Sequence, residues 1–157
     1  MTARIVYGED QALLRDETRR WLAERAPIET VRALLDDPRG DDPAVWKELG
    51  ELGWLGLVVP EAYGGAGLGA VDLAVVCDEA GRALLPTPLL SHVLAAHTIA
   101  LAGSEAQRDA WLPRLAAGEL RATLAHVEPD GGWRLSDTTL RCESGALTGS
   151  KHFTPQH

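Results

Sequence analysis

The apolar residues change their spacing near Leu120, and this change constrains the fold more than any other feature of the sequence. Before it, apolar side chains recur at helical intervals in stretches that end at proline, glycine or short polar runs. After it, strand-type patterns alternate with turn residues. We predict a mainly α fold: an N-terminal helical-bundle domain of about six helices over residues 1–120, then the first strands of an incomplete β-domain over residues 121–157.

Capping and turn residues delimit the predicted helices. The first five are expected at about 10–26, 28–35, 43–52, 70–84 and 89–101. Asp42 is expected to cap the third helix, Gly53 to end it in the left-handed conformation, and Thr87 to cap the fifth. A capping box at Ser104 starts the sixth helix, which Pro113 is expected to interrupt. The fifth is apolar almost all round, which predicts a central, buried position.

The predicted strands are short. They are Arg121–Val127, which alternates loosely, Thr138–Cys142 and Ala146–Phe153. Three such strands do not form a barrel or sandwich of independent stability. We therefore expect the sheet to be completed by a longer chain or by a partner.

Charge and composition disfavour several classes of function. The 157 residues carry a formal net charge of −8, which disfavours a nucleic-acid surface. The least polar stretch, 84–103, is interrupted by prolines and histidines, so no membrane span is expected. No signal peptide is expected either, because the first ten residues lack an apolar segment. Cys77 and Cys142 belong to no metal motif, and we interpret both as small buried hydrophobes in a reducing, cytoplasmic compartment. No metal site is predicted, because His92 and His97 are five positions apart and do not share a helix face.

Four stretches together resemble the acyl-CoA dehydrogenase family. The stretch 52–68, LGWLGLVVPEAYGGAGL, is similar to the family's LGWLGLxxPExYGGxGL segment, and 79–82, EAGR, to its E-x-G-R. The stretch 103–119 contains GSEAQ, LP and AGE, which resemble the family's GSEEQK, LP and GE. The stretch 149–153, GSKHF, resembles its G-x-K-x-(W/F) strand. The four occur in the family's order and cover essentially the whole chain.

The resemblance implies FAD-dependent α,β-desaturation of an acyl-CoA thioester. In such enzymes a carboxylate base takes the α-proton while the flavin accepts the β-hydrogen as hydride. The implied partners are an acyl-CoA substrate, an electron-transfer flavoprotein or similar acceptor, and further dehydrogenase subunits in a homo- or hetero-oligomer. The family's catalytic Glu lies in a later helical domain, so no residue here inherits a catalytic role, and the family position of Glu128 is structural. We expect this chain alone to be inactive and not to bind FAD tightly.

Several positions match the family's flavin and substrate contacts. The residues that align with flavin contacts are Leu124, His126, Val127, Phe153 and Thr154. Val127 replaces a threonine whose hydroxyl usually contacts the flavin, and Pro155 replaces another threonine, whose role Thr154 takes if the register slips by one. Trp133 stands where a small serine usually meets the thioester, which assigns it to substrate binding.

Alternatives remain open. The departures at Val127, Trp133 and Pro155 favour a non-catalytic partner subunit of a heteromeric acyl-CoA dehydrogenase, and a flavin-dependent monooxygenase of the same fold is a third hypothesis. The glycine-rich loop 63–69 is a weak phosphate-binding signal, and a tight connection bordering the acyl cavity is the favoured interpretation. On the fifth helix, a family tunnel wall, small residues are expected to leave room for a bulky acyl group. They are Ala95, Ala96 and Ala100.

Overall fold

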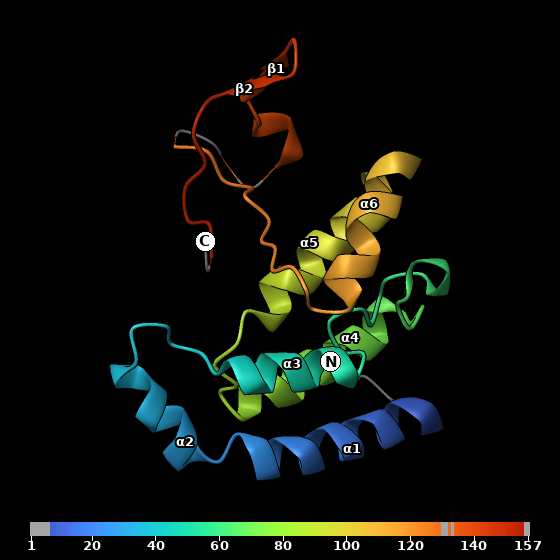
Figure 1. The fold of residues 1–157 in the computed structure, drawn as a ribbon, viewed down its shortest axis with the longest axis vertical. Helices are drawn as coiled ribbons and strands as arrows, with labels where there is room; N and C mark the ends of the chain where they lie inside the picture. Colours follow the sequence, from blue (N-terminus) through green and yellow to red (C-terminus); the bar gives the residue numbers. More distant parts are fainter. Residues whose placement is uncertain (1–6, 130–131, 133, 156–157) are drawn as a thin grey trace, which may run out of the picture.

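The helices α1 to α6 form one body, made of the described residues up to 120, and the two short strands stand apart from it in an arm, made of the described residues from 121 to 155 (Figure 1). A computed structural model describes residues 7–129, 132 and 134–155. Its elements are α1 (Glu9–Arg25), α2 (Ile28–Ala33), η1 (Leu34–Asp36), α3 (Pro43–Glu51), η2 (Glu61–Tyr63), α4 (Ala70–Arg82), α5 (Leu89–Ala102), α6 (Glu105–Ala116), η3 (Leu135–Asp137), β1 (Arg141–Glu143) and β2 (Ala146–Thr148). This confirms the predicted fold class, a mainly helical chain that ends in a few strands.

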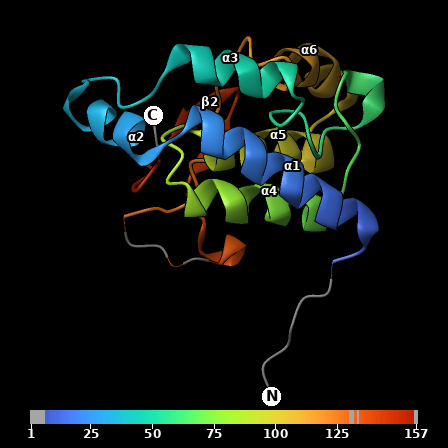
Figure 2. The same cartoon turned by 90° about the horizontal axis from the view of Figure 1, so that it is seen from below.

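Helix α1 lies alongside α4, as the view from below shows (Figure 2). Trp21 on α1 packs edge-on against Trp54, with ring centroids 5.1 Å apart. Arg19 on α1 donates twice to the Glu79 carboxylate, at 3.0 Å and 2.6 Å. Glu79 is 4% exposed, so this bidentate pair compensates a carboxylate that is otherwise withdrawn from water.

Two apolar clusters hold the body together. The first joins α1, α3, α4, α5 and the stretch 54–58; its buried members are Leu22, Ala26, Val45, Trp46, Leu49, Trp54, Leu55, Leu57, Val58, Val76, Leu89 and Val93. The second joins α5 and α6 around Val59, Ala96, Leu112, Leu115 and Ala116. Helix α5 contributes residues to both clusters and so connects them.

The glycine-rich loop folds back onto the buried stretch 54–59. A Cβ at Gly65 would lie 2.1 Å from the Val59 carbonyl oxygen and 2.6 Å from that of Gly56, so only glycine fits there. Gly64 and Gly67 take positive φ values of 79° and 64°, which turn the loop. The loop is thus the tight connection that its sequence predicts.

The local helix-end predictions at three positions are confirmed. The Asp42 side chain accepts from the Ala44 amide at 2.8 Å, and Gly53 follows α3 with φ +75°. Ser104 accepts from the Gln107 amide at 3.3 Å while the Gln107 side chain accepts from the Ser104 amide at 2.8 Å, which completes the capping box.

Two other helix-end predictions are wrong. Pro88, not Thr87, is the N-cap of α5, because the helix begins at Leu89 and Pro88 is therefore not its first helical residue, as a cap at Thr87 would require. Pro113 does not interrupt α6, which continues to Ala116. Pro113 lies on the exposed side of α6, where the carbonyl that loses its helical partner is open to solvent, and packing of the buried opposite side keeps the helix intact.

The predictions of full burial for α5 and Cys142 are also wrong. Leu90, Leu94 and Leu101 of α5 are 54%, 42% and 72% exposed, so this helix is buried on one side only. Cys142 is exposed and Cys77 half-buried, and both are free thiols. Cys142 is exposed because every residue of β1 and β2 faces solvent.

Among the residues that the structure describes, no strand forms at Arg121–Val127: Val127 makes an isolated bridge with His152, and residues 121–126 belong to no strand. The other two predicted strands are shorter than expected. Strands β1 and β2 pair antiparallel, with Cys142 opposite Leu147. Across the residues described, no helix has the length and apolar character needed to cross a bilayer.

Candidate functional site

Two segments far apart in the sequence meet at a single backbone bridge. The His152 amide donates to the Val127 carbonyl at 2.7 Å, and the two residues form an isolated antiparallel bridge. The bridge sets segment 124–128 beside segment 151–154, and we call the two segments together the bridged edge. It brings together the two groups of residues predicted to contact the flavin: Leu124, His126 and Val127 with Phe153 and Thr154.

The bridged edge presents two large apolar side chains to solvent. Leu124 is 41% exposed and Phe153 is 86% exposed, whereas His126, Val127 and Thr154 are half-buried. Phe153 has φ +52°, a left-handed conformation that costs energy for a residue with a Cβ. Trp133, the predicted substrate contact, lies outside the described residues.

Glu128 organises the edge from within. It is 6% exposed and accepts hydrogen bonds from the Lys151 ammonium (2.8 Å), the Thr139 hydroxyl (2.5 Å) and the amides of Thr139 (2.7 Å) and Leu140 (2.9 Å). These donors, Lys151 first among them, lower the pKa of Glu128 from its ordinary 4.5 to about 2. A carboxylate bonded in this way is a poor proton acceptor, so its role is structural.

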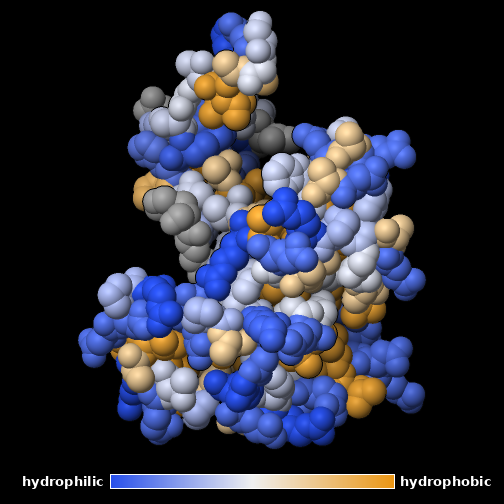
Figure 3. Space-filling view, viewed as in Figure 1, coloured by the Kyte–Doolittle hydropathy of each residue, from blue (hydrophilic) through white to orange (hydrophobic). Residues whose placement is uncertain are grey.

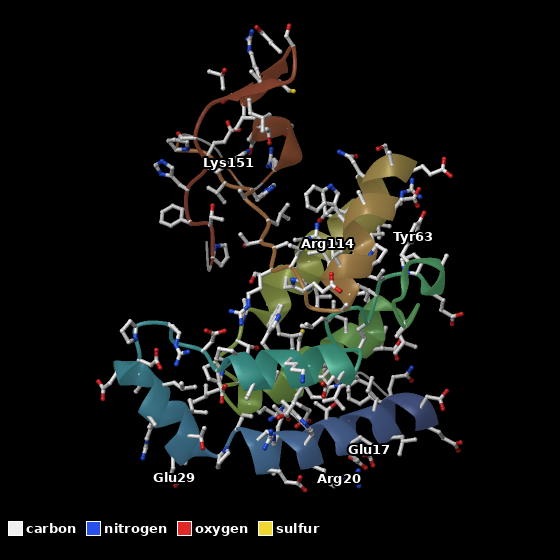
Figure 4. The ribbon with its side chains drawn as sticks, viewed as in Figure 1. Glu17, Arg20, Glu29, Tyr63, Arg114 and Lys151 are labelled. Atoms are coloured by element: carbon white, nitrogen blue, oxygen red, sulfur yellow. The ribbon has the colours of Figure 1, made fainter. Side chains whose placement is uncertain are left out.

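Lys151 connects the two sides of the edge. Besides Glu128, its ammonium donates to the His126 carbonyl at 3.1 Å, so it holds residues on both sides of Val127. Figure 4 shows Lys151 within the arm, where its side chain is 18% exposed. Its sequence signal was only its place in the GSKHF stretch, since its carboxylate partner lies 23 positions earlier.

A cavity of about 680 Å³ lies where the arm leaves the helical body. Three segments line it: 39–41, 85–88 and 121–123. Figure 3 shows the molecule hollowed between the arm and the end that carries α2. On one wall Arg121 pairs with Asp41 and lies 4.6 Å from the centre of the Trp46 ring, which fixes its guanidinium.

His92 joins this wall to the helices, a role that the sequence did not reveal. It is fully buried on α5; its Nε2 lies 3.1 Å from the Leu115 carbonyl oxygen, and its Nδ1 accepts from the Ala122 amide at 3.3 Å. The Trp46 ring meets it edge-on, with centroids 4.9 Å apart. Burial lowers the pKa of His92, so the ring is neutral at pH 7.

Two other features named from the sequence are the glycine-rich loop and the small residues of α5. The amides of residues 65–68 all donate to carbonyls of residues 56–60, so they are not available to a phosphate. Ala95 and Ala96 are buried and Ala100 is half-buried, whereas Leu90 and Leu94 lie on the outward side of α5. Among the side chains that the structure describes, no group of three or more His, Cys, Asp or Glu is placed to hold a metal ion.

Comparison with known proteins decides the family. Residues 8–119 match the family described as acyl-CoA dehydrogenase, N-terminal domain. The chain belongs to the acyl-CoA dehydrogenase family. Acyl-CoA dehydrogenase IpdE2 of Mycolicibacterium smegmatis is 35% identical over 151 residues, which are 95% of this chain and 47% of that protein. The chain therefore spans less than half the length of that dehydrogenase.

Solved dehydrogenase structures share the fold. The Tcur3481-Tcur3483 steroid ACAD is 30% identical with a TM-score of 0.73, and the match covers 97% of this chain and 41% of that one. The ChsE4-ChsE5 complex from Mycobacterium tuberculosis is 35% identical with a TM-score of 0.65, over 83% of this chain and 33% of that one. Both of these structures carry the names of two components.

Proposed function

We propose that this chain contributes to an FAD-dependent acyl-CoA dehydrogenase that introduces an α,β double bond into an acyl-CoA thioester. Residues 1–120 would form its N-terminal helical domain and residues 121–157 the beginning of its β-domain. The end of α6 at Ala116, the turn at Gly118 (φ +74°) and the extended chain that follows support this boundary. The two free cysteines are consistent with the reducing cytoplasm that we propose as its location.

The single observation that carries the proposal is the bridged edge. It gathers, from two separate segments, five residues at family flavin positions, and it leaves Leu124 and Phe153 open to contact. An isoalloxazine ring needs an apolar or aromatic surface with backbone groups nearby, and the exposed ring of Phe153 beside bridged backbone fits that need. Tight binding of the whole cofactor would require contacts beyond these few residues.

The residues of this chain would shape the site and position the flavin and the acyl group, and they would not transfer protons. Bound FAD would supply the acceptor for the hydride that leaves Cβ. Glu128 is committed to four hydrogen bonds, so we assign the base that takes the α-proton to a segment outside residues 1–157. The cavity beside residues 121–123, which adjoins the edge along the chain, and the outward leucines of α5 are the surfaces that we assign to the acyl group.

The decisive experiment is anaerobic titration with acyl-CoA. The full-length protein is purified alone and together with any dehydrogenase subunit that co-purifies with it, and the visible flavin spectrum is recorded. Bleaching of the flavin by one member of a panel of fatty, branched and steroid acyl-CoA thioesters is the expected result. A flavin-loaded preparation that no member of the panel bleaches would contradict dehydrogenation.

A second candidate is a partner subunit whose own flavin contacts are lost. Val127 supplies no hydroxyl at the bridge, and two of the similar structures are two-component assemblies. Phe153→Ala tests the partner role in the assembly of this chain with a second dehydrogenase subunit. Leu147→Ala is the control, since Leu147 is 71% exposed on β2. A flavin edge predicts loss of bound flavin for Phe153→Ala only, whereas a partner role predicts no loss for either variant.

A further inference from the structure

We propose that His92 is a positioning residue for the bridged edge. Its uncharged imidazole connects α5 to the end of α6 and to the Ala122 amide, and so fixes where the segment 124–128 begins. The link between this edge and flavin rests on the proposed function, whereas the structural connection stands without it.

The two hydrogen bonds select one form of the ring. The Leu115 carbonyl can only accept, so Nε2 carries the proton, and the Ala122 amide can only donate, so Nδ1 is bare. A doubly protonated ring would set an N–H of His92 against the N–H of Ala122. The other form of the neutral ring would break both bonds at once. The arrangement therefore requires the neutral Nε2–H tautomer.

The surroundings of His92 hold the ring in this form. Trp46 on α3 meets it edge-on, and the Trp46 indole N–H donates to the Gly118 carbonyl at 2.9 Å, which fixes the turn after α6. The charged groups at this junction are Arg121, which stacks on Trp46, and its ion-pair partner Asp41. The guanidinium adds to burial in disfavouring a positive charge on His92.

The position of Ala122 matters because the edge starts two residues later. Thr123 alone separates Ala122 from Leu124, and one extended residue has little freedom to absorb a shift of its neighbour. Lys151 and Glu128 hold the other end of the same segment. The segment is thus held at both ends, and His92 is its connection to the helical body.

The first test uses the unaltered full chain. Nitrogen-15 spectra of the histidine ring at pH 7 should show His92 as a neutral Nε2–H tautomer. A charged ring, or the Nδ1–H tautomer, would overturn the proposal. This measurement needs no variant and is therefore independent of any folding defect.

The second test compares hydrogen exchange in variants of the full chain. His92→Phe keeps a ring against Trp46 but removes both hydrogen bonds, so exchange of the Ala122 amide, which donates to His92, should rise about five- to thirtyfold while α1 and α4 keep their protection. His92→Asn, which keeps an acceptor near the position of Nδ1, should restore part of that protection. His97→Phe is the matched control, because His97 lies on the same helix and its Nδ1 has no partner in the described chain. Unchanged exchange at the Ala122 amide, or an equal rise throughout the helices, would refute the positioning role.

The third readout connects the residue to flavin. In the flavin-loaded assembly, His92→Phe should weaken flavin affinity and shift its visible absorption, and His97→Phe should do neither. Local loss of protection with an unchanged flavin spectrum would contradict the role of His92 at the flavin. If the assembly holds no flavin at all, the proposed function fails, and the exchange data still decide the positioning role.

Discussion

The helical body and the arm are each stabilised by a different kind of interaction. The buried apolar side chains that the structure describes all lie between Leu22 and Ala116, whereas the buried residue of the arm is Glu128. The body therefore depends on apolar burial, which acts without direction and tolerates small shifts. The arm depends on hydrogen bonds to one carboxylate, which are directional and sensitive to charge. A chain that joins the two can lose order in the arm while the body stays folded.

The largest effect should come from removing core volume in the body. Leu49 is fully buried in the first apolar cluster, and Leu49→Ala should lower the free energy of unfolding by about 2–5 kcal/mol. Thermal or urea denaturation measures it. Leu35→Ala, at a position 80% exposed, is the control and should change little. An equal effect for both variants would break the comparison.

Gly65→Ala should have the next largest effect and lower the free energy of unfolding by about 1–3 kcal/mol, because the new methyl group meets backbone carbonyls that cannot move independently. Gly81→Ala is the matched control: nothing lies within 4 Å of its added Cβ, and it sits inside α4. That control should stabilise the chain by about 0.5–1 kcal/mol, since alanine favours helix more than glycine does. Denaturation midpoints of the two variants should therefore move in opposite directions. A Gly65→Ala chain as stable as the unaltered one would show that the loop relaxes away from residues 56–59.

Glu128→Gln should leave the body intact and loosen the arm. The amide keeps the shape of the side chain but loses the charge that Lys151 and the three other donors bond. Amide exchange at 139–140 and 152 should rise on the order of tenfold, because hydrogen bonds to a charged acceptor are roughly twice as strong as neutral ones. Lys47→Met, which removes an exposed cation of α3, should not alter this exchange. Loss of the cooperative thermal transition in Glu128→Gln would mean that arm and body are one unit.

Acid should act on the same group, with a smaller effect. The folded pKa of Glu128 is about 2 and its ordinary value is 4.5, so the folded state is the one that favours the charged form. Its stabilisation is therefore complete above about pH 4.5 and declines as the pH falls towards about 2. The amide signals of Thr139 and Leu140 should follow this titration in nuclear magnetic resonance spectra. A midpoint near 4.5 would show that the four bonds do not persist in solution.

The sequence predicts those parts of the fold that depend on neighbours along the chain. The caps at Asp42 and Ser104 and the turn at Gly53 each involve residues within a few positions, and all three were predicted correctly. The cap predicted at Thr87 is wrong because it required Pro88 to be the first helical residue, whereas α5 begins at Leu89. The prediction of a strand at Arg121–Val127 is wrong because a strand requires a hydrogen-bonded partner strand. The residue pattern of one segment does not say whether such a partner lies beside it.

In the candidate site, too, the sequence predicts some features and not others. Family motifs indicated the residues of the bridged edge, but not the groups that hold it. The partners of Lys151 and His92 lie 23 to 30 positions away, so no local pattern announces them. Burial of His92 depends on Trp46 and Leu115, which meet only when α3, α5 and α6 have packed.

The bidentate pair between Arg19 and Glu79 has a practical consequence for handling this protein. Glu79 is covered because a guanidinium from the first helix reaches it across 60 positions of sequence. Any form shortened past residue 25, by design or by proteolytic clipping, would leave that carboxylate and the apolar face around Trp54 bare at once. Such a form should aggregate or require detergent to stay in solution. Adding the missing N-terminal helix back as a separate peptide should restore a monodisperse sample.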